Sequence, residues 1–165
     1  MKILKKLKET ILFKKSEVAL GEGSVTQYII FENKHFLSLI FYKWNTINQV
    51  RFHTHAFGAI AFLLKGWYWE KVRFQGIEMT NFVNVPFLPR MLPRNYCHAI
   101  GNAKPGTITM VVAGPWQKNW LEYFPDTDTW VEYTWGRKVT KKSNEHSCVD
   151  EKTGTIHETK IMEEV

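Results

Sequence analysis

At 165 residues, with 44% hydrophobic and 15% aromatic content, the chain is long enough to form one domain with a sizeable core. No continuous apolar run reaches the length of a bilayer-spanning helix, and lysines interrupt the apolar residues of the N-terminus, unlike in a signal peptide. We therefore expect a cytoplasmic protein without a membrane partner, and the two cysteines, Cys97 and Cys148, fit a reducing compartment because they form no disulfide framework.

The net charge of +6 is concentrated at the two ends of the chain. Residues 1–15 hold six lysines against one glutamate, and residues 137–142 hold four basic residues and no acid. Because residues 143–165 are acidic, residues 16–136 are nearly neutral. A nucleic-acid-binding domain normally carries a basic stripe on its folded face. We therefore predict that nucleic acid is not a partner.

The first predicted element is a short basic amphipathic helix within residues 1–15. Its apolar residues stand at helical spacing with lysines between them, namely Ile3, Leu4, Leu7, Ile11 and Leu12. Such a helix can lie on a membrane surface. A segment this short more often packs on its own domain, and we favour that interpretation.

From Val18 onward the chain consists of short β-rich runs separated by glycine and asparagine turns. The predicted strands are residues 26–31, 36–44, 56–64, 67–74, 82–85 and 107–113, with a stiff proline-spaced loop through Pro86, Pro89 and Pro93. This spacing is typical of an all-β sandwich or barrel. We assign the barrel to residues 16–138, and the charged residues 139–165 to a tail that is disordered or adds a peripheral element.

Residues 56–64 are apolar on both faces of the predicted strand, so each face must be covered. Alternation places Ala59, Ala61 and Leu63 inside the barrel, and Ile60 and Phe62 outside. The small side chains at 59 and 61 would leave space for a ligand unless aromatic residues fill it. The outer apolar face favours a homodimer.

Three histidines form a candidate metal site. If residues 51–55 are a strand, His53 and His55 project from one face, and His98 on a neighbouring strand can complete a three-nitrogen group. Imidazole suits Fe, Zn, Ni and Cu, and three protein ligands leave an open coordination position. The pattern therefore predicts a working metal site, although a His-x-His pair alone is also common at ordinary polar positions.

The stretches around these histidines resemble the two motifs of the cupin superfamily. The first motif is His-x-His followed by an acidic residue and then a glycine, and Gly66 falls at the glycine position. The second is Pro-x-Gly-x-x-His-x-x-x-Asn, matched here by Pro93, His98 and Asn102. Across roughly residues 25 to 138 the resemblance implies a single-domain cupin jelly-roll barrel.

The chain departs from these motifs at four positions. Ala59 stands where the acidic metal ligand usually is, Asn95 replaces the glycine of the second motif, and Ile47 and Phe87 replace the leading glycines. Any metal would then be held by His53, His55 and His98 alone.

The chain also resembles a narrower group of small, uncharacterised cupin-like proteins of bacteria and their viruses. The matching residues are Ala113-Gly114-Pro115-Trp116 and Thr129-Trp130-Val131-Glu132-Tyr133, but Ala56-Phe57 stands where that group has Pro-Trp. This resemblance supports the fold and names no reaction.

Four further residues come into question around the site. Tyr96 shares a strand face with His98, so its hydroxyl could serve a bound ligand as a general acid, or it could simply be a core tyrosine at the barrel rim. Asn95, Asn102 and Tyr96 are candidates for orienting the imidazoles. Glu70 could replace the missing acidic ligand, but lying beyond a turn it is better explained as solvated or salt-bridged.

Three functions remain open, and the sequence leaves undecided whether the chain is an enzyme. The first is a metal-dependent cupin acting on a small molecule, with Fe(II) favoured and Zn or Ni as other divalent metals. The resemblance to the thiol dioxygenases of the superfamily implies a three-His Fe(II) dioxygenase or hydroxylase, whereas Zn would favour hydrolysis or lyase chemistry. The second is a non-catalytic cupin that binds or sequesters a small ligand. The third is an accessory protein that contacts a partner through its basic N-terminus and aromatic C-terminal strands.

Overall fold

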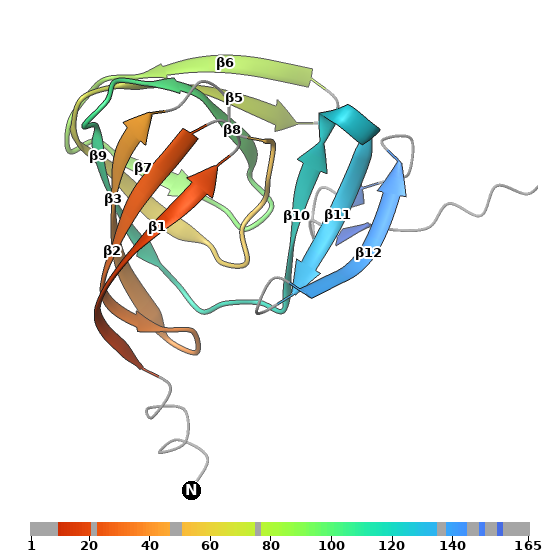
Figure 1. The fold of residues 1–165 in the computed structure, drawn as a ribbon, viewed down its shortest axis with the longest axis horizontal. Helices are drawn as coiled ribbons and strands as arrows, with labels where there is room; N and C mark the ends of the chain where they lie inside the picture. The colour runs from red at the N-terminus through yellow and green to blue at the C-terminus, as the bar shows by residue number, and fades with distance from the viewer. Residues whose placement is uncertain are drawn as a thin grey trace, which may run out of the picture.

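The structure is a computed structural model that describes residues 10–20, 23–46, 51–74, 77–134, 138–144, 149–150 and 155–156. These residues form strands and one short 3-10 helix, η1 (Pro125–Thr127) (Figure 1). None of their helices is long and apolar enough to cross a bilayer. The strands are β1 (Ile11–Leu20), β2 (Gly23–Asn33), β3 (Leu37–Thr46), β4 (Ala59–Lys65), β5 (Tyr68–Phe74), β6 (Ile77–Val83), β7 (Pro89–Leu92), β8 (Cys97–Ala103), β9 (Ile108–Ala113), β10 (Asn119–Phe124), β11 (Thr129–Thr134), β12 (Lys138–Asn144), β13 (Val149–Asp150) and β14 (Thr155–Ile156).

One wall of the molecule is a six-stranded sheet with the order β1-β2-β3-β9-β4-β7. All of its pairs are antiparallel. The β3–β9 and β4–β9 pairs join segments far apart in the sequence, so β9 lies between two strands that precede it by many residues. This order brings β7, and with it Arg90, to one edge of the sheet.

The opposite wall combines two three-stranded sheets, β6-β5-β8 and β10-β11-β12. Residues 51–55 run between them as an extended segment. His53 forms isolated antiparallel bridges to His98 on β8 and to Glu122 on β10. The segment therefore joins the two sheets, and Figure 1 shows β10–β12 standing to one side of β1–β9.

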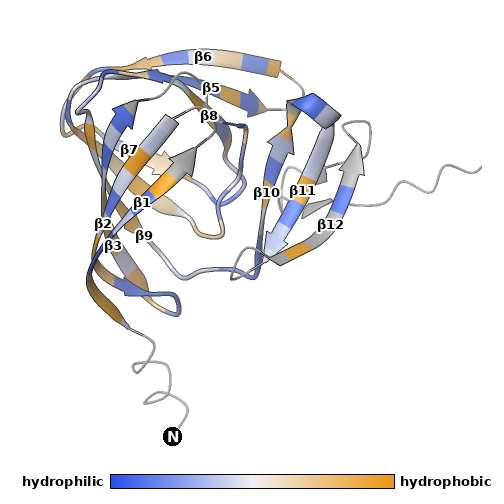
Figure 2. Ribbon diagram, in the orientation of Figure 1, coloured by the Kyte–Doolittle hydropathy of each residue, from blue (hydrophilic) through white to orange (hydrophobic). Residues whose placement is uncertain are grey.

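The burial pattern follows the two-residue period of extended chain. Along β4 the inward residues Ala59, Ala61 and Leu63 are buried, whereas Ile60 and Phe62 are only partly buried, as the sequence predicted. Figure 2 shows hydrophobic and hydrophilic residues interspersed along the strands, as expected where one face packs inward. This alternation gives the barrel interior its buried lining.

A glycine at position 66 is required by the turn between β4 and β5. Gly66 has φ of +90°, and a Cβ added there would lie 2.9 Å from the Cα of Thr107. The Thr107 hydroxyl in turn bonds the backbone of Trp67. The turn therefore needs both a left-handed conformation and close backbone approach, which only glycine provides.

Three local predictions need correction. Residues 3–9 of the predicted helix lie outside the described residues, but the helix is wrong for Ile11 and Leu12, which belong to β1 because pairing with β2 outweighs their helical spacing. Residues 51–55 are extended without forming a regular strand. The proline-spaced loop contains a short strand, β7, at the sheet edge, where a proline at the first position is tolerated.

Part of the predicted tail is strand. β12 pairs with β11, and β13 pairs with β14, so the described residues of 139–165 form a peripheral element. Contacts between β10 and β14 place the β13–β14 pair beside the β10–β12 sheet.

Candidate metal centre

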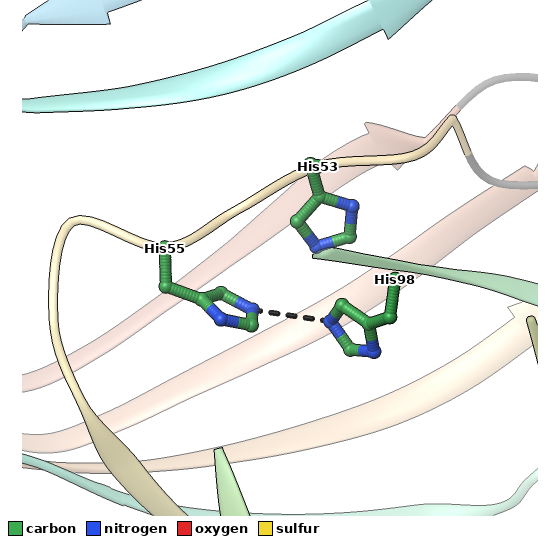
Figure 3. A group of neighbouring side chains, drawn as sticks. All are labelled: His53, His55 and His98. Atoms are coloured by element: carbon green, nitrogen blue, oxygen red, sulfur yellow. Dashed lines mark hydrogen bonds between the residues drawn. The ribbon is translucent and has the colours of Figure 1, made fainter. Parts of the chain in front are cut away.

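The structure brings His53, His55 and His98 together on one face of the wall opposite the six-stranded sheet (Figure 3). The His53 N–H donates to the His98 carbonyl at 2.9 Å, and the His98 N–H donates back to the His53 carbonyl at 3.0 Å. This reciprocal pair is the hydrogen-bonded type of an antiparallel ladder, so both side chains point to the same face. One ring nitrogen from each histidine lies within 4.8 Å of the others.

The two histidines at 53 and 55 are held in place by the residues that alternate with them. Thr54 is buried on the opposite side, its N–H donates to the Leu121 carbonyl at 2.9 Å, and its hydroxyl accepts the Leu121 N–H at 2.9 Å. Phe52 packs against Leu121 and Trp130. A short segment is thus fixed from both sides although it is not a regular strand.

His98 has one ring nitrogen committed to a carboxylate. Its Nδ1 donates to Oε1 of Glu70 at 2.6 Å. Burial alone would raise the pKa of Glu70, but the hydrogen bond and charge of His98, together with Arg90, lower that pKa to about 2. The carboxylate is therefore ionised at neutral pH and can only accept, so in the neutral form of His98 the proton sits on Nδ1 and Nε2 presents a lone pair.

His53 has its tautomer fixed in the same way by a different partner. Its Nδ1 lies 2.9 Å from the backbone carbonyl of Arg51. A carbonyl oxygen only accepts hydrogen bonds, so Nδ1 of neutral His53 carries the proton and Nε2 is left with its lone pair. Two of the three histidines thus offer Nε2 as a ligand atom.

His55 completes the group as a neutral imidazole. Burial, followed by the nearby His98 and His53, lowers its pKa well below 6.5. Its Nε2 lies 3.2 Å from Nε2 of His98, and its Nδ1 is buried without a hydrogen-bond partner. Without a cation, Nε2 of His55 must donate to His98, whereas a bound cation would take both lone pairs and move the His55 proton to Nδ1.

The residues present therefore fit a divalent metal that prefers nitrogen ligands. Such an ion takes neutral imidazoles as ligands, and in His53 and His98 an acceptor-only partner at Nδ1 sets Nε2 as the ligand atom of the neutral ring. Among the described residues the group contains no carboxylate. The three-His ligand set expected from the sequence is thus geometrically available.

Glu70 has a different place from the one first considered for an acidic residue. It is fully buried, and its second oxygen, Oε2, accepts hydrogen bonds from Arg90 and from the Tyr96 hydroxyl. It acts on the site through His98, as a salt-bridged glutamate rather than a ligand. Arg90 was missed by sequence reasoning because it lies in the proline-spaced stretch, where no local pattern points inward.

Tyr96 lies beside the histidines with its hydroxyl engaged. Its ring centroid is 5.2 Å from that of His98, and its hydroxyl donates to Glu70 at 3.1 Å. Burial, and then the charge of Glu70, raise its pKa above the usual 10.0, so it is a neutral phenol at neutral pH. Asn102, in contrast, is exposed on β8.

No protein-family model and no curated protein matches this sequence. Among solved structures, a variant of oxalate decarboxylase from Bacillus subtilis is 13% identical with a TM-score of 0.50, over 64% of this chain and 29% of that chain. Vicilin from Solanum lycopersicum (tomato) is 15% identical with a TM-score of 0.51, over 68% of this chain and 34% of that chain. This chain has the cupin jelly-roll fold.

An RmlC-like cupin from Shewanella frigidimarina is also similar, at 15% identity and a TM-score of 0.45, over 62% of this chain and 85% of that chain. This chain spans about a third or less of the length of the oxalate decarboxylase and vicilin chains. At these identities the likeness concerns the fold alone.

Proposed function

We propose that this cupin holds a divalent metal ion through His53, His55 and His98 and acts on a small molecule. The observation that carries the proposal is the set of three ring nitrogens within 4.8 Å of one another. It is supported by the hydrogen bonds that engage Nδ1 of His53 and His98 and so make Nε2 the ligand atom of each neutral ring. A cupin fold with this three-His group fits a metal-binding protein.

Fe(II) is the favoured ion, with Zn or Ni as alternatives, and three nitrogen ligands leave coordination positions open for substrate or dioxygen. The reaction class we propose is a dioxygenase or hydroxylase reaction. The chain's own contribution is to orient the imidazoles through the hydrogen bonds at Nδ1 of His53 and His98. Tyr96, a neutral phenol beside His98, is the proposed hydrogen-bond donor toward a bound small molecule. To donate to that molecule, the Tyr96 hydroxyl would have to give up its hydrogen bond to Glu70.

Elemental analysis of the untagged protein tests the proposal. We expect about one iron, zinc or nickel ion per chain, lost in the double variant His53→Ala and His98→Ala. His35→Ala is the matched control, because His35 does not belong to the group. Equal metal contents in the three proteins, or a wild-type chain that takes up no metal when offered Fe(II), Zn(II) and Ni(II) separately, would contradict the proposal.

Dioxygen uptake by the iron-loaded protein tests the proposed dioxygenase or hydroxylase reaction. We expect uptake to depend on an added small molecule, and thiols are the first class to screen. Tyr96→Phe should retain iron but lose most of the turnover, because only the hydroxyl is removed. Iron-loaded protein that never consumes dioxygen would remove the oxygenase assignment and leave the metal site.

A non-catalytic cupin that binds or sequesters a small ligand is the second candidate. The observation that favours it is the ligand group itself, which among the described residues has no acidic member. Native mass spectrometry distinguishes the two. A retained organic ligand on metal-free protein supports sequestration, whereas metal without such a ligand supports the first candidate.

The homodimer predicted from the apolar outer face of β4 stays a proposal, as does a cytoplasmic location. Ile60, Phe62 and Leu64 on that face are each partly buried within the single chain. Light scattering of the purified protein would give the mass in solution. A monomer at all concentrations would remove the proposed homodimer.

A further inference from the structure

A buried carboxylate lies directly behind one of the three histidines. Glu70 on β5 is 0% exposed, and its Oε1 accepts the hydrogen bond from Nδ1 of His98. In the register of β5 and β8, Glu70 pairs with Ile100 and Val72 pairs with His98. Glu70 is thus one pleat along from His98 on the same inward face, within reach of its ring.

The other oxygen of the same carboxylate is anchored from the opposite wall of the barrel. Arg90 on β7 belongs to the six-stranded sheet, and its guanidinium donates both to Oε2 of Glu70 and to the Tyr68 hydroxyl. The Tyr96 hydroxyl donates to Oε2 as well, at 3.1 Å. Arg90 on β7, Tyr96 just before β8 and His98 on β8 therefore hold Glu70 in one orientation.

This arrangement decides how the carboxylate can influence a metal. Oε1 is bonded to Nδ1 of His98 and Oε2 to Arg90 and Tyr96. Neither oxygen is therefore available as a fourth ligand beside the three ring nitrogens of the metal site. Its negative charge therefore acts on the ion from behind the His98 ring, without a direct bond. A carboxylate bonded to the remote nitrogen of a ligating imidazole fixes the ring and makes its other nitrogen a stronger ligand.

We infer that Glu70 is a positioning residue that fixes Nε2 of His98 toward the metal and supplies, through that ring, the negative charge absent from the ligand group. The inference rests on the proposed metal site. It assigns to Arg90 the task of holding the carboxylate in place, so that the charge of Glu70 acts on one histidine. Glu70 would thereby take over part of the role of an acidic ligand from outside the coordination sphere.

A purely structural role for Glu70 is the competing explanation, because a buried ion pair that loses one partner weakens the fold. Four proteins distinguish the positioning role from the structural role: wild type, Glu70→Gln, the double variant Glu70→Gln with Arg90→Met, and Glu78→Gln. The double variant removes both charges and so relieves the unpaired arginine of the single variant. Glu78 is exposed on β6 and provides the matched loss of one carboxylate away from the site.

The first measurement is Zn(II) affinity, by competition with a chromophoric chelator at fixed pH and salt. We expect Glu70→Gln to weaken binding 10-fold to 100-fold, the double variant to stay equally weak although its stability recovers, and Glu78→Gln to match wild type. Wild-type affinity in Glu70→Gln, or recovery of affinity along with stability in the double variant, would overturn the inference. Failure of the wild type to bind Zn(II), Fe(II) or Ni(II) would instead overturn the proposed function.

The second measurement needs no metal. Long-range proton–nitrogen correlation spectra of metal-free protein report which ring nitrogen of His98 carries the proton. We expect the Nδ1–H tautomer in wild type and Glu78→Gln, and a mixture of tautomers in both proteins that lack Glu70, because glutamine can donate as well as accept. An unchanged pure tautomer without Glu70 would contradict the positioning role even where the metal site itself stands.

Discussion

The two faces of the wall formed by β8, residues 51–55 and β10 differ in chemistry although the same backbone carries both. The inward face presents His53, His55 and His98 with a buried carboxylate behind them. The opposite face presents an apolar cluster of Phe52, Cys97, Leu121, Trp130 and Tyr123. Neighbouring residues along one segment thus serve either the site or the core.

The apolar face holds the segment that carries His53 and His55, so these ligands do not themselves have to pack in the hydrophobic core. Residues Phe52 and Thr54 fasten the segment to β10 on one side, so the alternate residues 53 and 55 need few contacts of their own. A slip of one residue would exchange the two faces and bury imidazoles among apolar side chains. Cys97 belongs to the apolar face, where it packs against Leu121 and Trp130.

The largest expected loss of stability comes from emptying the apolar face. Leu121 is 0% exposed, so Leu121→Ala should lower the free energy of unfolding by about 2–5 kcal/mol while the folded protein keeps its metal. His53→Ala should do the opposite, losing the metal with a change in stability below about 1 kcal/mol. Urea unfolding of metal-free protein, together with elemental analysis, measures both, and a variant that loses both properties would show that the faces are not independent.

Acid should destabilise the protein through the inward face. The pKa of Glu70 falls from the usual 4.5 to about 2 on folding, so its contribution is complete above pH 4.5 and is lost as pH falls toward 2. The difference corresponds to a contribution on the order of 3 kcal/mol. The lowered pKa of His55 adds a loss that begins below pH 6.5, where the unfolded histidine takes up a proton and the folded one does not.

Urea unfolding of metal-free wild type between pH 3 and pH 7 measures this slope. In Glu70→Gln the free energy of unfolding should no longer fall steeply below pH 4.5, because that loss depends on the carboxylate. The smaller loss between pH 6.5 and 4.5 should remain. Leu121→Ala should lower stability by the same amount at every pH. The same pH dependence of unfolding free energy in wild type and Glu70→Gln would show that Glu70 is not the source of the acid destabilisation.

A smaller loss of stability should follow from weakening the attachment of residues 51–55 to β10. Thr54→Val keeps the shape of the side chain but leaves the Leu121 N–H without its acceptor, at a cost of about 1–3 kcal/mol. Because residues 53 and 55 flank this position, we also expect Zn(II) affinity to fall several-fold. Thr80→Val, at an exposed position on β6, is the control, and a Thr54→Val protein with unchanged stability would show that this bond does not hold the segment.

Much of the local organisation follows from the sequence because it depends on neighbouring residues. The two-residue period placed His53 and His55 together and gave the inward residues of β4. Gly66 was matched to the glycine of the first motif, and it has a positive φ in the turn after β4. The motif resemblance was specific enough to predict the jelly roll, which the structural comparisons confirm.

Only the tertiary structure decided which distant segments meet. The helical spacing of Ile11 and Leu12 gave way to pairing with β2, and residues 51–55 are held by β8 and β10 without forming a regular strand. The carboxylate of Glu70, the guanidinium of Arg90 and the ring of His98 meet because β5, β7 and β8 enclose one interior. Side-chain period is a local property that a sequence carries by itself, whereas strand order and register depend on the free energy of the whole barrel.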